Sequence, residues 1–354
     1  MDVPIFYKDK PLFGFDLGHD SIKVMQIAES GRRDFVVGYG NASFDPKAIK
    51  NGVIVNPEII AKEAYQLISK GLIGSIDTKR IAASIPVSNT FNRILTLPKM
   101  DKDDLTQAVN LEAEQYIPIP LDQLYVDYEI ARKTEDGSNE ILMVAVPKSI
   151  VDSYITLFDM LGLEAALLET TISAVTRIVT HSDRTGVPTL IIDFGAVSSD
   201  LAVFDQTIRV TGTAEWGGET ITQDLAKALG VTGRQAYTIK TRYGLNPGKK
   251  QAEIGKALEP MLTKLMAEIK KMTRFYEERS DKEAHIEQII VLGGGANLPG
   301  LSTYLTDKLR LPTRLVNPWQ NLSFGNLQPP HKLETTVYTT AAGLGLAHTK
   351  GQLQ

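Results

Sequence analysis

Cysteine is absent from the chain, which excludes disulfide bonds, thiolate metal sites and cysteine nucleophiles. Long apolar runs are missing too. No stretch approaches the roughly 18 residues of a membrane span, and the N-terminus has no signal-peptide pattern. Neither sign of charge dominates, because 38 basic residues stand against 42 acidic ones, so nothing favours nucleic acid as a partner. The five histidines show no metal-ligand spacing. We therefore expect a cytoplasmic protein, and any association with a membrane would have to come through a partner.

The first half of the chain alternates strands and helices. The whole chain has 354 residues, too many for one simple core, so we expect two domains. Apolar periodicity, prolines and glycines predict the boundaries of the elements. They are strands at 12–17, 22–28, 34–40, 79–86 and 164–169, helices at 56–71, 148–161 and 170–181, a helix from 101 that ends at Pro118 and Pro120, and a hairpin over 124–147 with its polar turn at 135–139.

After a polar linker at 181–188 the opening plan repeats. The stretch "TLIIDFGAVSSDLAVF" reads as strand, glycine turn and strand, like "FGFDLGHDSIKVMQI" at residues 13–27. A strand near 207–213, a helix at 218–229 and a looser stretch through 255 follow. A long helix at 256–279 comes next, and then a strand, a glycine turn and a helix over 285–301. The long helix has its apolar residues on one face: Leu258, Met261, Leu262, Leu265, Ile269, Met272 and Phe275. This internal duplication predicts two similar domains.

The two repeated turns are candidate phosphate sites. Aligning them pairs Asp16 with Asp193, which are 193 − 16 = 177 residues apart, about half the chain. Gly18 and Gly195 allow sharp turns that bring backbone N–H groups close to an anion. An Asp before each turn can hold hydrated Mg²⁺ against phosphate oxygens. One such turn is usually structural, but two matched turns can close around a phosphate chain.

Together these motifs resemble those of the actin-like ATPase superfamily, which includes actin, heat-shock chaperone ATPase domains, FtsA and sugar kinases. The fold class implied is α/β, a duplicated actin-like (ribonuclease H-like) fold. "DLGHDSIK" and "DFGAVSSD" resemble the two phosphate motifs, and "LGGGANLPGL" the adenosine motif. "LETTISAVTRI" and "TTAAGLGLA" resemble the two connecting motifs, and "EWGGETIT" is similar to the segment beside the sugar of the nucleotide.

The resemblance implies roles for named residues and the cofactors ATP and Mg²⁺. Asp16 and Asp193 would hold the metal, Asp193 would also orient an attacking water, and Glu169 would position water at the hinge. The implied nucleotide contacts are Gly18, His19, Asp20, Ser21, Lys23, Gly195, Ala196, Val197, Ser198, Gly217, Gly218, Glu219, Lys240, Gly293, Gly294, Gly295 and Ala296. Two positions depart from the superfamily pattern: His19 replaces the usual Ser or Thr, and Tyr237 replaces the Glu three residues before Lys240.

The insertion at 83–131 is similar to the 1C subdomain of FtsA and, more closely, of the PilM family of type IV pilus assembly proteins. The phrases "RILTLPKM", "EAEQYIPIPLDQ" and "LGLEAALLET" carry this resemblance. In that family the groove between 1C and the main body (1A) binds the short cytoplasmic N-terminal segment of PilN, a bitopic inner-membrane protein. The residues expected to bind the partner are Asn92, Arg93, Tyr116, Ile117 and Pro118. From the residues alone, a helix end packed on its own hairpin and a strand-end salt bridge stay open as alternatives.

The resemblance implies an ATP-binding adaptor, at most a slow ATPase, at the cytoplasmic face of the inner membrane, in which domain closure tunes the binding of PilN. PilO, the pilus motor ATPases and self-association are further expected interactions. The expected division is 1–80, 148–181 and 331–354 for the first domain, 82–147 for 1C, and 182–330 for the second domain, with a 2B part near 230–258. Alternatives are an FtsA-like polymerising scaffold, a small-molecule kinase of the same fold, or a protein that binds ATP without hydrolysing it.

Overall fold

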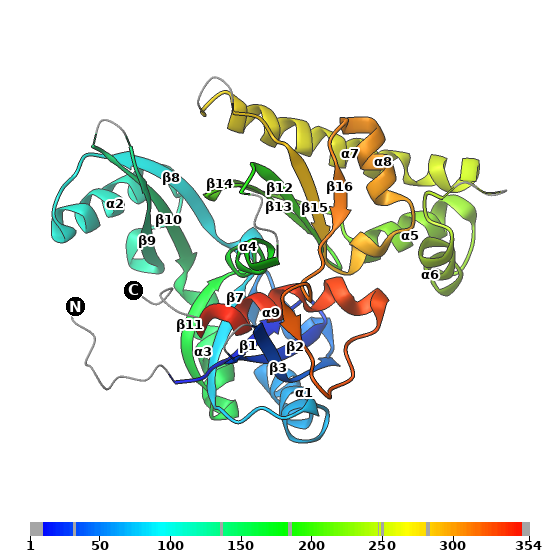
Figure 1. The fold of residues 1–354 in the computed structure, drawn as a ribbon, viewed down its shortest axis with the longest axis horizontal. Coiled ribbons are helices and arrows are strands. Elements are labelled where there is room, and N and C mark those ends of the chain that lie inside the picture. The colour runs from blue at the N-terminus through cyan, green and yellow to red at the C-terminus, as the bar shows by residue number, and fades with distance from the viewer. Residues whose placement is uncertain are drawn as a thin grey trace.

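The computed structural model describes residues 10–30, 33–134, 137–182, 186–246, 248, 251–280 and 284–348. Two residues of the expected hairpin turn (135–136), three of the expected linker (183–185) and both chain ends lie outside these ranges. Figure 1 shows the two larger sheets in separate halves of the molecule, with helices α4 (Thr171–Ser182) and α9 (Thr339–Gly345) between them.

The first sheet is built around an antiparallel ribbon extended by parallel strands. Its order is β11-β7-β1-β2-β3-β17, with β6 also paired to β3. The strands are β1 (Phe13–Leu17), β2 (Ser21–Ser30), β3 (Arg33–Ser43), β6 (Ile73–Gly74), β7 (Arg80–Ile85), β11 (Glu164–Thr170) and β17 (Leu322–Ser323). Strand β7 lies between β1 and β11, and β17 pairs Leu322 with Asp34. The first sheet therefore includes short segments of the ranges expected for 1C and for the second domain.

The second sheet repeats this arrangement. Its order is β14-β13-β12-β15-β16, with antiparallel pairs on one side of β12 and parallel pairs on the other. The strands are β12 (Thr189–Phe194), β13 (Ser199–Asp205), β14 (Thr207–Ala214), β15 (Gln288–Leu292) and β16 (Thr313–Leu315). The predicted duplication is confirmed, because β12, β13 and β14 correspond to β1, β2 and β3, and β15 and β16 correspond to β7 and β11.

Helices cover both faces of each sheet. The first sheet packs on α1 (Pro57–Lys70) and α3 (Lys148–Leu161). The second packs on α5 (Gly218–Leu229), α7 (Gln251–Glu277) and α8 (Leu301–Leu309). The inner face of the first sheet packs against α4 and α9, and the inner face of the second sheet packs against α4. No helix within the described ranges is long and apolar enough to cross a membrane.

A third, smaller unit lies beside the second sheet (Figure 1). Strands β8 (Phe91–Leu97), β9 (Leu124–Lys133) and β10 (Asn139–Pro147) form a sheet in the order β8-β10-β9. Helix α2 (Lys102–Tyr116) covers it, and the Asp101 side chain accepts a hydrogen bond from the Asp104 amide at the start of the helix. Leu105, Val109 and Ala113 pack on the sheet, so this insertion has its own core. The short strands β4 (Ile49–Lys50) and β5 (Val53–Ile54) pair with each other.

Two expectations for the second domain are wrong. The stretch expected to be loose contains helix α6 (Gly233–Arg242), and α7 begins at Gln251 rather than 256. Thr232 and Gln235 form a reciprocal capping box that starts α6. Phe275 was placed on the buried face of the long helix, but its side chain is 42% exposed and Tyr276 is buried instead. The Arg279 guanidinium lies 3.8 Å from the centre of the Phe275 ring, which covers part of this exposed surface.

Helices α4 and α9 touch through their backbones. A Cβ atom at Gly343 of α9 would collide with the Ala174 carbonyl of α4, and one at Gly14 of β1 would collide with the Ala341 carbonyl. Side chains at these two positions would push the central helices away from each other and from the first sheet. Glycine is therefore required where the two halves of the molecule join.

We predict that Gly343→Ala lowers the thermal unfolding midpoint by several degrees, because overpacking a tight contact costs about 1–3 kcal/mol. The matched control is Gly255→Ala inside α7, where an added Cβ meets nothing within 4 Å. That change should leave the midpoint unchanged or raise it, since alanine is the better helix former by roughly 0.5–1 kcal/mol. Equal effects of the two substitutions in calorimetry would contradict the close packing described here.

Candidate nucleotide site and partner groove

The first turn joins β1 to β2 and places charged groups at its base. The Gly18 amide donates to the Ser21 carbonyl at 2.8 Å, which closes the turn. Asp16, at the end of β1, is 6% exposed and accepts a hydrogen bond of 3.0 Å from the Ser84 hydroxyl. Lys23 lies opposite Asp16 in the β1/β2 ladder, with its Nζ 3.4 Å from the carboxylate. Asp16 is thus held by a hydroxyl on one side and a cation on the other.

The second turn, between β12 and β13, is held by the start of α5. The amides of Gly218 and Glu219 donate to the carbonyls of Gly195 and Ala196, at 2.9 and 2.8 Å. A Cβ at Gly217 would lie 2.5 Å from the Ala196 carbonyl, so only glycine fits there. Lys240 of α6 donates from Nζ to the Gly218 carbonyl at 2.7 Å. The predicted sugar-side residues and the second turn therefore form one connected group.

The glycine run after β15 reaches the same place. Gly293 has φ +78°, and a Cβ there would collide with the Asp193 carboxylate. Its amide and carbonyl are hydrogen-bonded to the backbone and hydroxyl of Thr336, at 3.2 and 2.9 Å. A 3₁₀ turn over Gly294–Asn297 follows it, with α8 beginning at Leu301. The third motif predicted from the sequence thus lies directly against Asp193.

Charges within the site act on one another. The pKa of Asp193 is raised to about 7, mainly by loss of hydration and also by the charges of Asp200 and Asp16, while the charge of Lys23 acts in the opposite direction. Burial also raises the pKa of Asp200 to about 6, although a hydrogen bond from Thr213 favours the ionised form. Since the charges of Asp16 and Lys23 reach Asp193, the two halves of the molecule share one electrostatic site.

The donor set suits a metal held jointly with phosphate oxygens. Among the described residues no cluster of three or more histidine or acidic side chains forms a ready-made metal site. Mg²⁺ commonly takes only one or two carboxylates, keeps several waters and completes its shell with substrate phosphates. Asp16 and Asp193, at the ends of equivalent strands, fit that requirement.

Glu169, the predicted water-positioning residue, is engaged elsewhere. It lies at the end of β11, next to Ser84 in the β11/β7 ladder, and is 11% exposed. Both of its carboxylate oxygens accept from Arg177 of α4, at 2.5 and 2.7 Å, and Arg177 also donates to the Gly343 carbonyl. These bonds tie β11 to the contact between α4 and α9.

The predicted partner-binding residues gather around one hollow. A cavity of about 350 Å³ is lined by Asn92, Arg93, Tyr116 and Ile117, four of the five. The Arg93 guanidinium lies over the Tyr116 ring, 3.2 Å from its centre. Pro118 lines a second, more open hollow, which Ile117 shares. Arg93 therefore stacks on an aromatic ring instead of forming the salt bridge that the sequence left open.

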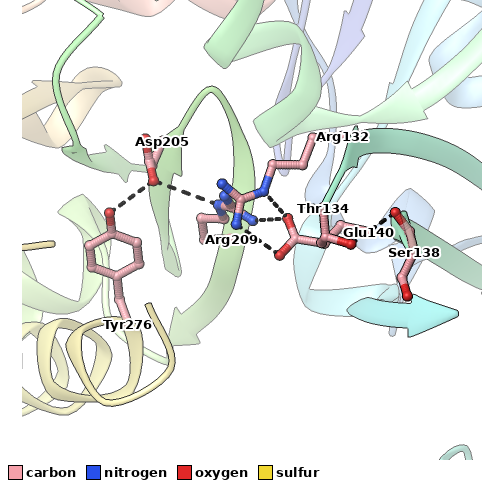
Figure 2. A network of polar contacts seen from close by, with 7 residues as sticks. All are labelled: Arg132, Thr134, Ser138, Glu140, Asp205, Arg209 and Tyr276. Atoms are coloured by element: carbon pink, nitrogen blue, oxygen red, sulfur yellow. Dashed lines mark hydrogen bonds and ion pairs between the residues drawn. The ribbon is translucent and has the colours of Figure 1, made fainter. Parts of the chain in front are cut away.

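The opposite wall of this cavity consists of Thr211, Gly212 and Thr213 of β14. The cavity therefore lies between the small unit and the second sheet, whereas the partner groove expected from the sequence lies between 1C and the first domain. Strand β14 lies against β8, and Arg209 of β14 reaches across to the hairpin of β9 and β10. Figure 2 shows Arg209 and Arg132 converging on Glu140, with Nη1–Oε2 and Nε–Oε2 distances of 2.5 and 2.7 Å.

This network is largely shielded from water. Arg209 and Glu140 side chains are 11% and 13% exposed. Burial alone would raise the pKa of Glu140, but the hydrogen bonds and charges of Arg132 and Arg209 outweigh it and lower that pKa. On its other side Arg209 lies 3.8 Å from Asp205, which accepts a hydrogen bond of 3.0 Å from Tyr276 of α7 (Figure 2). The 1C hairpin, β14 and α7 are thereby linked.

Several residues of the site were not identified from the sequence. Ser84 and Thr336 leave no local pattern, because each is brought to the site by a strand or turn far away in the chain. Asp200 could have been found from the sequence, because the alignment of the two turns makes it equivalent to Lys23. Lys23 follows Asp16 by seven residues, and Asp200 follows Asp193 by seven residues. The two sheets confirm this equivalence, because Lys23 faces Asp16 and Asp200 faces Asp193.

The duplicated sheets, the two crossing helices and the paired turns define this chain as a member of the actin-like ATPase fold class. The comparison with protein families makes the assignment narrower. A family model described as "Type IV pilus assembly protein PilM" matches residues 14–349. The chain belongs to this family.

Solved structures and a curated protein are similar to this chain. The "PilM-PilN type IV pilus biogenesis complex" aligns with a TM-score of 0.83 at 20% identity, over 97% of this chain and 100% of that one. MreB 5 of Spiroplasma citri bound to AMPPNP aligns at 0.57 and 13% identity, over 96% of each chain. Cell division protein FtsA of Streptococcus pneumoniae serotype 2 is 22% identical over 347 residues, 87% of this chain and 75% of FtsA. At these identities the likeness to the solved structures shows the fold.

We predict that Asp193→Asn stabilises the protein without ligands, and does so more at pH 8 than at pH 5. Because the folded pKa is about 7 against 3.8 ordinarily, the folded wild type holds a proton that the unfolded chain releases. Its stability therefore falls as pH rises from about 4 to about 7 and then levels off. The neutral amide escapes this loss, so the gain in thermal midpoint, on the order of a few degrees, should grow with pH. A gain that is the same at both pH values would contradict the raised pKa.

Proposed function

We propose that this chain is an ATP-binding adaptor of the type IV pilus assembly platform. It binds the cytoplasmic N-terminal segment of PilN, and nucleotide-linked closure of its two halves tunes that binding. The family assignment supports the pilus role. The observation that carries the adaptor role is the groove, where four residues expected to contact the partner line one cavity together with β14 of the second sheet.

The nucleotide is held between the two halves. Asp16 and Asp193 supply carboxylates to Mg²⁺, which neutralises phosphate charge when bound. Amides and hydroxyls of the two turns, Gly18 to Ser21 and Gly195 to Ser198, face the phosphates, and Lys23 adds a positive charge. Gly217 to Glu219, Lys240 and Gly293 to Ala296 surround the sugar and base. Asp193 is the candidate for orienting an attacking water, and hydrolysis is slow, since an adaptor needs binding and closure more than turnover.

The groove suits a short extended segment with apolar and polar side chains. Its walls combine Phe91, Ile117 and Met143 with threonine hydroxyls and the stacked Arg93–Tyr116 pair. Two outer strands, β8 and β14, lie on either side, and unpaired strands offer backbone groups to an extended peptide. Through PilN the protein is held at the cytoplasmic face of the inner membrane. Its further proposed partners there are PilO, reached indirectly, the pilus motor ATPases, and other copies of itself.

The nucleotide part is tested with Asp16→Asn. Losing one of the two carboxylates should weaken ATP binding in the presence of Mg²⁺ by at least about tenfold, and much less in its absence. The matched control is Asp224→Asn on the exposed side of α5, which should leave both affinities unchanged. Calorimetric titration with ATP, with and without Mg²⁺, measures this. Equal loss with and without Mg²⁺ would place Asp16 outside the metal site.

The partner part is tested with Tyr116→Ala. Removing the ring on which Arg93 stacks should weaken the binding of a synthetic peptide of the PilN N-terminus by roughly tenfold, as expected for an aromatic contact at an interface. Tyr65→Ala is the control, since Tyr65 lies on α1, away from the groove, and is 69% exposed. Fluorescence anisotropy of a labelled peptide gives both affinities. A wild-type protein that binds ATP but not the peptide would refute the adaptor role.

A further inference from the structure

Strand β14 takes part in both sites described above. Near its end, Thr211, Gly212 and Thr213 line the partner groove. Thr213 also donates from its hydroxyl to the Asp200 carboxylate at 2.7 Å. In the ladders of the second sheet Asp193 faces Asp200, and Asp200 faces Thr213. One row of three residues therefore runs from the candidate metal site to the wall of the groove.

The equivalent row in the first sheet ends differently. There Asp16 faces Lys23, and Lys23 faces Asn41. Lys23 is a cation that neutralises its neighbouring aspartate directly, at 3.4 Å. Asp200 carries the same charge sign as Asp193, so it cannot compensate that residue and is held by the Thr213 hydroxyl instead. The second sheet thus has two neighbouring carboxylates, and one of them, Asp200, accepts a hydrogen bond from a residue of the groove, Thr213.

The other end of β14 is fixed to the 1C unit. Arg209 shares Glu140 with Arg132, and Asp205, just before β14, accepts the Tyr276 hydroxyl (Figure 2). Because β14 is held at Arg209, a displacement of Thr213 would change the distance between β14 and β8 along the groove. A cation placed at Asp193 attracts Asp200 as well, since the two carboxylates interact through partly desolvated protein.

We propose that β14 couples the nucleotide site to the partner groove, and that the Asp200–Thr213 hydrogen bond is the contact that transmits the change. This inference rests on the proposed function, because it assigns regulation to the same two sites. Metal and nucleotide at Asp193 shift Asp200, Thr213 follows its hydrogen-bond partner, and the wall formed by 211–213 moves against β8. Peptide and nucleotide then affect each other's affinity by the same factor.

The test compares Thr213→Val with Thr211→Val. Both substitutions replace a threonine by a residue of the same shape, on the same strand, face and groove. Residue 211 lies opposite Ala202, so its hydroxyl has no carboxylate to hold. Thr213→Ser keeps the hydroxyl and serves as the rescue variant. Far-ultraviolet circular dichroism and thermal midpoints establish that all three variants fold.

Two readouts are measured with and without ATP·Mg²⁺. The first is hydrogen exchange of the backbone amides at 91–93 and 211–213, which needs no peptide. The second is the dissociation constant of the PilN peptide. In the wild type, Thr211→Val and Thr213→Ser, nucleotide should change both the hydrogen exchange and the dissociation constant of the peptide. The ratio of the dissociation constants with and without nucleotide should be at least about fivefold, in either direction. In Thr213→Val the ratio should fall to within about twofold of one, and the exchange should no longer respond to nucleotide.

The outcomes separate the two levels of inference. One outcome is that the wild type does not bind the PilN peptide, while its hydrogen exchange responds to nucleotide and this response disappears only in Thr213→Val. That outcome would refute PilN as the partner and support the coupling. A nucleotide response retained in Thr213→Val, or lost equally in Thr211→Val, would overturn the coupling through Asp200 while leaving both binding functions intact. No nucleotide response at the groove of the wild type, in a protein that binds ATP·Mg²⁺, would also overturn it.

Discussion

The close backbone contact between α4 and α9 is the constraint on which the site depends. Because residues 343 and 14 are glycines, α9 lies in direct backbone contact with α4 and with β1 of the first sheet. Because Coulomb energy falls with distance and with exposure to water, this proximity allows the charges of Asp16 and Lys23 to act on Asp193. Bulkier residues at the joint would separate the two strand ends and turn one shared site into two unrelated turns.

The duplicated halves have been adapted differently within the same frame. The first half neutralises its aspartate with Lys23, whereas the second half leaves two carboxylates side by side. Two such groups close together are costly to ionise in the free protein. A bound cation would remove that cost, so the second half gains most from occupancy. In the proposed metal site, the first turn is therefore already compensated by Lys23, and the second turn is the one that would respond to a bound cation.

Much of this architecture could be predicted from sequence, because the signals were local and periodic. Alternating apolar residues and glycine turns indicated the strands of both sheets, and aligned aspartates indicated their equivalence. Helix α6 was missed since its apolar face is narrow, although Thr232 and Gln235 give a capping-box pattern. The far wall of the groove was missed for another reason: β14 and β8 are separated by more than a hundred residues, and Arg209 gives no sign in the sequence of its partner Glu140. The prediction placed Phe275 on the face of the long helix that Tyr276 in fact occupies, an error of one residue. Tyr276 is held on that face by its hydrogen bond to Asp205.

The neighbouring positions of β8 and β14 have a consequence for solubility. Each is the last strand of its sheet, so each carries backbone groups that its own sheet does not pair. Exposed strands of this kind recruit strands from other molecules and promote aggregation. Because β8 and β14 lie against each other, with Arg209 and Glu140 linked across them, each strand shields the edge of the other. The contact between the two units therefore protects the protein against uncontrolled sheet extension.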